Sequence, residues 1–163
     1  MPNRHTHTHT HSHTECPFSR FANSGRQVRA EHEAAHQKTL KRLATDYISA
    51  QKDADARAVV LAGFGLSSVP GELFSWSLFS SWRGSLTVVD VSNNALEEIP
   101  AAVRKLEALT HFNCSYNRLT LLPESLAECT RLAALEVQHN NLAHVPLRVG
   151  ELQVGWRHGG GQG

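Results

Sequence analysis

The chain has 163 residues, of which 40% are hydrophobic and 19% are charged, so its length and composition suit one globular domain plus a tail. The formal net charge is +1 and no basic run alternates with aromatic residues, which argues against a nucleic-acid partner or an anionic membrane surface. No apolar stretch reaches the roughly 18 to 20 residues that span a bilayer, so we expect no membrane insertion.

Residues 1–29 are predicted to form a disordered tail rich in histidine and threonine. From His5 to Thr14 the sequence HTHTHTHSHT alternates histidine with small hydroxyl residues and offers nothing apolar to bury. Five histidines at every second position would collect divalent metal ions along an extended chain. We favour the interpretation that this is a low-complexity run with incidental metal affinity.

The next segment, residues 30–52, is predicted to be an amphipathic helix. It contains strong helix formers and neither glycine nor proline. Its apolar residues follow the i, i+3, i+4, i+7, i+8 spacing of one helix face: Leu40, Leu43, Ala44, Tyr47 and Ile48. We expect this stripe to pack on the domain and to cap it.

The beginning of this helix contains His32-Glu33-Ala34-Ala35-His36, which matches the H-E-x-x-H pattern of zinc hydrolases. Such an enzyme needs a third ligand, and the following QKTLKRLATDY lacks the glycine and histidine of the extended motif. We therefore expect no catalytic residues, no metal site and no cofactor. A metal-dependent hydrolase built on His32, Glu33 and His36 stays as a remote alternative.

A repeat dominates the rest of the chain. Three units begin at residues 86, 109 and 132, so successive units are 23 residues apart. Their sequences are LTVVDVSNNALEEIPAAVRKLEA, LTHFNCSYNRLTLLPESLAECTR and LAALEVQHNNLAHVPLRVGELQV. They share the pattern L-x-x-L-x-L-x-x-N-x-L-x-x-L-P-x-x-L-x-x-L, with other apolar residues or cysteine at some leucine positions. A divergent unit, ARAVVLAGFGLSSVPGELFSW, begins at Ala56 and has Phe64 in place of the asparagine.

This spacing predicts a solenoid in the α/β class. Each unit forms one coil with a short strand, and stacked coils place the strands in a short, curved parallel sheet. We expect about four coils, residues 56–85, 86–108, 109–131 and 132–154, capped by the N-terminal helix and followed by a flexible glycine-rich end, residues 155–163. The strand residues predicted to point into the core are Val89, Val91, Phe112, Cys114, Leu135 and Val137.

The repeats resemble the leucine-rich-repeat family. Ser49-Ala50-Gln51-Lys52, at the end of a helix that leads into a degenerate first repeat, is similar to small intracellular family members of the LPxxL type. The resemblance covers about residues 40–154 and implies a cytoplasmic scaffold or adaptor without catalysis. Some relatives are myristoylated on a glycine after the initiator, but Pro2 stands there, so no such anchor is expected. Relatives carry more repeats, so we favour the interpretation that this chain is a truncated version of a longer protein. The alternatives are that Trp156 folds over the edge of the last coil, or that a partner or a second copy covers that edge.

Three repeat asparagines, Asn94, Asn117 and Asn140, are expected to form a ladder that pairs the backbone groups of the sharp turn after each strand. Cys114 and Cys129 occupy apolar repeat positions and are assigned to packing. With Cys16 the cysteines number three, and no signal peptide precedes them, so we expect free thiols in a reducing compartment.

The outward strand positions predict a concave protein-binding face. Its candidate contact residues are Asp90, Ser92, His111, Asn113, Ser115, Tyr116, Glu136, Gln138 and His139. The expected function is a non-catalytic interaction module for a protein partner, with a regulatory subunit of an enzyme such as a phosphatase as the alternative. The last coil exposes an apolar edge, so self-association through that edge is a further possibility.

Overall fold

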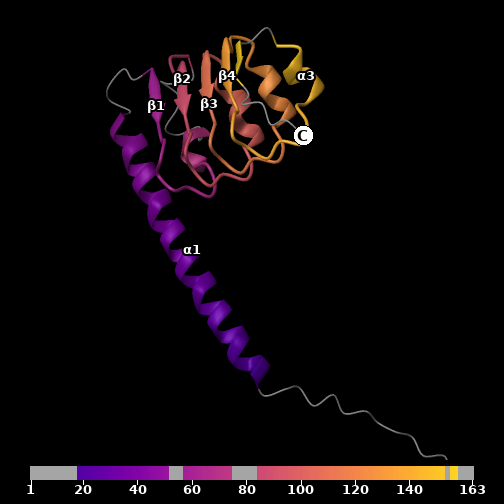
Figure 1. Ribbon diagram of the computed structural model, residues 1–163. Coiled ribbons are helices and arrows are strands. Elements are labelled where there is room, and N and C mark those ends of the chain that lie inside the picture. The colour runs from indigo at the N-terminus through magenta and orange to yellow at the C-terminus, as the bar shows by residue number, and fades with distance from the viewer. Residues whose placement is uncertain (1–17, 52–56, 75–83, 153–154, 158–163) are drawn as a thin grey trace, which may run out of the picture. The chain divides into compact units, whose positions relative to one another are not determined.

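The computed structural model describes residues 18–51, 57–74, 84–152 and 155–157 (Figure 1). The chain divides into two units, Met1–Ala35 and His36–Gly163. Helix α1, Phe18–Gln51, contributes to both. None of the described helices combines the length and the apolar character that crossing a membrane requires. The histidine run lies outside the described residues.

Helix α1 begins earlier than the sequence predicts. The predicted tail reaches residue 29, whereas the structure is helical from Phe18. Gly25 does not end the helix, because a single interior glycine costs only about 1 kcal/mol against alanine. The prediction of disorder for residues 18–29 is therefore wrong in this structure.

The second unit includes the end of α1, which packs on the first coil. Ala44 and Ile48 are buried, and Leu40 and Tyr47 are half-buried against the same core. Leu43 is 54% exposed, which corrects its place in the predicted stripe: it lies at the edge of that helix face. Gln37 ties the helix to the coil, because its Nε2 donates to the Gly65 carbonyl at 2.9 Å and its Oε1 accepts from the Ser67 amide at 2.9 Å.

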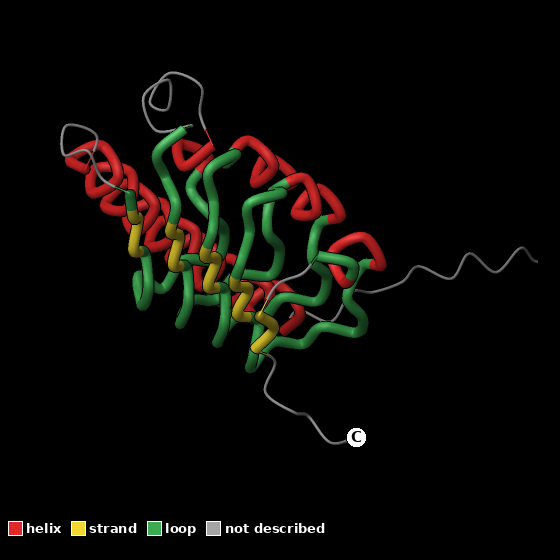
Figure 2. The backbone as a smooth tube through the Cα atoms, turned by 90° about the horizontal axis from the view of Figure 1, so that it is seen from above, coloured by secondary structure: helices red, strands yellow, loops and turns green. Residues whose placement is uncertain are grey.

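Five parallel strands stand side by side in chain order: β1 Ala58–Val60, β2 Val88–Asp90, β3 His111–Asn113, β4 Ala134–Glu136 and β5 Gly155–Arg157. Figure 2 shows the strands along one side of the solenoid and short helices along the other. Those helices are η1 Gly71–Phe74, η2 Ala101–Lys105, η3 Glu124–Glu128 and α3 Leu147–Gly150. Helices η2, η3 and α3 are each preceded directly by a proline, Pro100, Pro123 and Pro146, with φ of −61°, −71° and −55°. Proline fits at this position because no backbone hydrogen bond of the helix needs its missing N–H group.

Strands β2, β3 and β4 begin at residues 88, 111 and 134, which reproduces the 23-residue period. The sequence predicts a flexible end for residues 155–163 and no fifth strand. Gly155–Arg157 nevertheless pairs with β4 in parallel register. Strand pairing uses backbone groups, so it needs no repeat pattern in the side chains.

The core runs along the inside of the strands. All six residues predicted to point inward, three in the strands and three directly after them, are buried with exposed fractions from 0 to 4%: Val89, Val91, Phe112, Cys114, Leu135 and Val137. This confirms the predicted alternation. Burial falls off on the other side of the last repeat, where Val145 is 39% exposed although the equivalent Leu122 is 3% exposed.

Candidate functional site

The outward side of β1–β4, here called the sheet face, brings together four of the nine predicted contact residues: Asp90, His111, Asn113 and Glu136. Register aligns Asp90 with Asn113 and Asn113 with Glu136 on neighbouring strands. It aligns Val88, His111 and Ala134 in a second row, and His111 is exposed. A depression over β2–β4 is lined by these six residues together with Val89 and Phe112. Four of these six side chains are polar, and all six are half-buried or exposed.

Two predicted contact residues, Ser92 and Ser115, are not available on this surface. They are only 4% and 2% exposed. The Asp90 side chain accepts a hydrogen bond from the Ser92 amide at 2.9 Å. Asn113 Oδ1 accepts from the Ser115 amide at 3.1 Å and from its hydroxyl at 2.7 Å. These contacts fix the chain as it leaves each strand, which gives both serines a structural role.

Tyr116 and His139 form an exposed aromatic pair at the rim of the sheet face. Their ring centroids lie 4.2 Å apart with an interplanar angle of 21°, and Tyr116 is 49% exposed. Both have left-handed backbone, with φ of 53° and 55°. Asn93 and Gly63 have the same conformation at the equivalent repeat position, with φ of 54° and 72°. Glycine, asparagine and, to a lesser degree, histidine are found in that region, whereas tyrosine adopts it only at a cost in free energy.

Gln138 extends this rim toward the strands. Its Nε2 donates to Glu136 Oε2 at 3.3 Å. Its Oε1 is buried and has no hydrogen-bond partner among the described residues. An unsatisfied buried acceptor of this kind costs about 1–3 kcal/mol.

The asparagine ladder supports the surface from beneath and is confirmed. Asn117 Nδ2 donates to the carbonyls of Val91, Cys114 and Ser115 at 3.0–3.1 Å, while its Oδ1 accepts from the Leu96 amide at 3.0 Å. One side chain thus pairs backbone groups of two neighbouring coils.

The other two ladder residues repeat this geometry. Asn94 Nδ2 donates to the carbonyls of Leu61 and Val91 at 2.8 and 2.9 Å, and Asn140 Nδ2 donates to those of Cys114 and Val137 at 2.9 and 3.0 Å. In this way each turn is joined to the coil before it.

The described cysteines are packing residues. Cys114 and Cys129 are free and buried. Burial raises the pKa of Cys114 to about 12 and that of Cys129 to about 11. Each thiol donates to a backbone carbonyl of a neighbouring coil, at 3.4 Å to Glu136 and 3.5 Å to Val103. Both groups are therefore unsuited to act as nucleophiles at neutral pH. Cys16 lies outside the described residues.

His32, Glu33 and His36 are exposed on α1. Within the described ranges, no group of three or more His, Cys, Asp or Glu side chains is placed to hold a metal ion. On the sheet face, His111 Nδ1 lies 2.9 Å from the hydroxyl of Thr110. That contact holds the ring at the strand and gives no arrangement of nucleophile, base and orienting acid.

Comparison with known proteins adds a family match. Residues 84–142 match the family model described as leucine rich repeat. The chain is 33% identical over 121 aligned positions to the plant intracellular Ras-group-related LRR protein 8 of Oryza sativa subsp. japonica, covering 58% of this chain and 30% of that one. It is 37% identical over 68 residues to Toll-like receptor 1 of Homo sapiens, covering 42% of this chain and 8% of the receptor.

Another relative, the adenylate cyclase of Schizosaccharomyces pombe, is 33% identical over 70 residues, which cover 43% of this chain and 4% of the cyclase. The chain thus spans less than a third of the length of each of these relatives. The fold is similar to that of an LRR protein of Leptospira interrogans, with a TM-score of 0.50 at 20% identity, covering 66% of this chain and 32% of that one.

Proposed function

We propose that this chain, which is a leucine-rich-repeat protein, acts as a non-catalytic binding module whose protein partner contacts the sheet face. Leucine-rich-repeat domains bind proteins in general. The observation that carries the proposal is the exposed Tyr116–His139 pair, whose residues follow the ends of β3 and β4 by three positions. Exposed aromatic groups next to polar side chains are the residues that contribute most to protein interfaces.

The backbone conformation of the pair supports the same conclusion. Holding tyrosine at positive φ costs about 1–2 kcal/mol, a cost that glycine or asparagine would avoid. Such strain is commonly found where a side chain is needed for binding. The unsatisfied Oε1 of Gln138 lies at the same rim, and a donor supplied by a partner would pair it after a small rotation.

The finer role we infer is that of a cytoplasmic scaffold or adaptor. The same surface would serve a regulatory subunit of an enzyme such as a phosphatase. Self-association is the remaining proposal for the last coil, where Val145 is 39% exposed and Leu147 is 80% exposed. Contact through the sheet face and contact through the last coil involve different residues, so separate variants distinguish them.

Affinity purification with quantitative mass spectrometry tests the proposal. The test variant is Tyr116→Ala/His139→Ala, and the matched control is Arg104→Ala/Glu128→Ala, which removes an exposed ion pair of 3.8 Å between η2 and η3. Partners recovered with the wild type and the control should fall about tenfold or more with the test variant, as for loss of an interface anchor. Partners retained by the test variant but lost by the control would overturn the proposal, provided that thermal unfolding shows both variants folded.

A further inference from the structure

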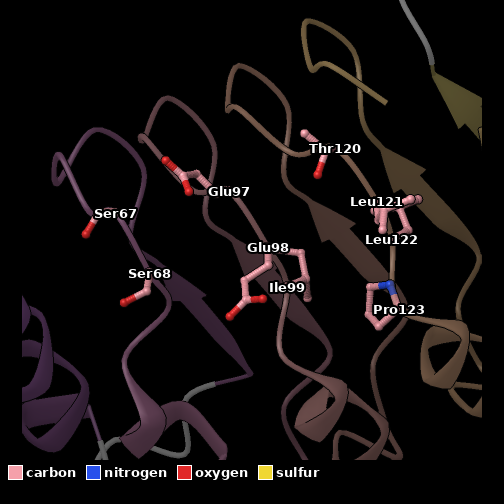
Figure 3. A pocket seen from close by; sticks show the side chains of 9 residues that line it. All are labelled: Ser67, Ser68, Glu97, Glu98, Ile99, Thr120, Leu121, Leu122 and Pro123. Atoms are coloured by element: carbon pink, nitrogen blue, oxygen red, sulfur yellow. The ribbon is translucent and has the colours of Figure 1, made fainter. Parts of the chain in front are cut away.

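A second recess lies away from the strands, where three consecutive coils run from the asparagine turn toward the short helices (Figure 3). We call it the flank groove. Its lining residues are Ser67 and Ser68 of the first coil, Glu97, Glu98 and Ile99 of the second, and Thr120, Leu121, Leu122 and Pro123 of the third. It shares no residue with the depression of the sheet face.

The flank groove has an apolar part. Ile99 and Leu122 are 4% and 3% exposed and anchor the coils to the core. Leu121 is 53% exposed beside them, although the equivalent positions of the neighbouring coils carry Ser68 and Glu98. An exposed leucine at a position that is otherwise polar gives a partner apolar area to cover, worth about 25 cal/mol per Å² removed from water.

The flank groove also has an acidic part. Glu97 and Glu98 lie on the middle coil, between the serine pair and Leu121 (Figure 3). Both are exposed. Over the described residues, neither carboxylate takes part in an ion pair or a hydrogen bond, and no lysine or arginine lines the groove. Two unpaired carboxylates next to an exposed leucine favour a cationic and apolar occupant.

We propose that the flank groove binds an extended segment of a partner protein in which a lysine or arginine stands two positions from a large apolar residue. In an extended chain, residues two positions apart face the same side and lie about 7 Å apart. That separation lets the cation reach Glu97 and Glu98 while the apolar side chain covers Leu121 on the next coil. The hydroxyls of Ser67, Ser68 and Thr120 remain to pair the backbone of the segment.

The binding test uses the full chain and mixed nine-residue peptides. One library has arginine at position 4 and leucine at position 6, a second replaces the arginine by glutamate, and the other positions are randomised. Amide chemical shifts in NMR spectra report where binding occurs. We expect the arginine library to bind at least about fivefold more tightly than the glutamate library, less tightly at high salt, and to shift the amides of residues 97–99 and 120–122.

Three variants make the test specific. Glu97→Gln/Glu98→Gln removes both charges at constant shape and should reduce the preference for the arginine library to about twofold or less. Leu121→Ser, which introduces the residue of the first coil, should weaken binding of both libraries. Glu151→Gln is the control, since it removes an exposed carboxylate outside the groove and should change nothing. Equal binding of the two libraries, shifts confined to the sheet face, or an unchanged preference in the double glutamine variant would overturn the proposal.

Discussion

Two neighbouring repeats, residues 109–131 and 132–154, carry the same apolar pattern and bury it differently. Leu119 is fully buried, whereas its equivalent Leu142 is half-buried. Leu122 is 3% exposed, whereas Val145 is 39% exposed. The difference disappears at the strands, where Leu135 and Val137 are as buried as Phe112 and Cys114.

The neighbour explains this contrast. Strand β5 lies beside β4 and covers the strand side of the last repeat, and the described residues provide no comparable cover beside Val145. Burial in this fold is therefore set by the adjacent coil as much as by the residue itself. Stability should be distributed unevenly along the solenoid, in a way that paired substitutions can measure.

The largest expected effect comes from truncating a leucine in each repeat. Leu119→Ala should lower the free energy of unfolding by about 3–5 kcal/mol, because the cavity is closed on all sides. Leu142→Ala should lower it by about 1–2 kcal/mol, because the half-buried site is already partly in contact with water. Urea unfolding followed by circular dichroism measures both values. Equal losses would show that the two repeats have equivalent neighbours in solution.

The asparagine ladder should show a smaller version of the same difference. Asn117→Ala removes a buried side chain with three donor contacts and one acceptor contact, and should cost about 1–3 kcal/mol. Asn140 makes the equivalent contacts but is half-buried, so water can replace part of them and Asn140→Ala should cost less. Melting temperatures of the two variants make the comparison, and an unchanged transition for Asn117→Ala would contradict the ladder's contribution.

Alkaline pH should lower the stability of the repeat formed by residues 109–131, which holds both described thiols. Folding raises the pKa of Cys114 from 9.0 to about 12 and that of Cys129 from 9.0 to about 11. The contribution of these thiols is intact below pH 9 and is lost as the pH rises toward the folded pKa values, because the unfolded thiols ionise first. At pH 10 the loss should be about 1 kcal/mol per thiol. The pH dependence should become shallower in Cys114→Ala, and an identical slope would exclude this cause.

Thiol labelling gives the finest comparison. On a Cys16→Ser background, native Cys114 and Cys129 should react slowly with a thiol reagent, because they are buried and protonated. Adding Leu152→Cys places a thiol at the position equivalent to Cys129 in the last repeat, where the side chain is half-buried. That thiol should react at least about tenfold faster than Cys129. Equal rates would show that the last repeat is covered in solution.

Much of the fold follows from the sequence because the repeat ties each residue type to one environment. The inward strand residues and the asparagine ladder were predicted correctly for this reason. The burial of Ser92 and Ser115 was missed, because strand alternation no longer holds where Asp90 and Asn113 bond to the backbone two residues ahead. The first turns of α1 and strand β5 were missed because each lacks an apolar period.

The candidate sites were less predictable than the fold. Tyr116 and His139 were placed at the rim, but their left-handed backbone was not foreseen, although Gly63 and Asn93 at the same repeat position were a signal for it. The flank groove has no sequence signature, since it is formed by residues from three coils. The one indication in the sequence is Leu121, a leucine at a repeat position where the two preceding coils have Ser68 and Glu98.

The row of left-handed residues has one more consequence. From the first coil to the fourth, the side chain at this position changes from none, at Gly63, to a short amide, at Asn93, and then to two aromatic rings. The side chains along this border are therefore small in the first two coils and large in the third and fourth. If the proposed partner rests on the sheet face, the bulkier end of this border would favour one direction along the stack over the reverse.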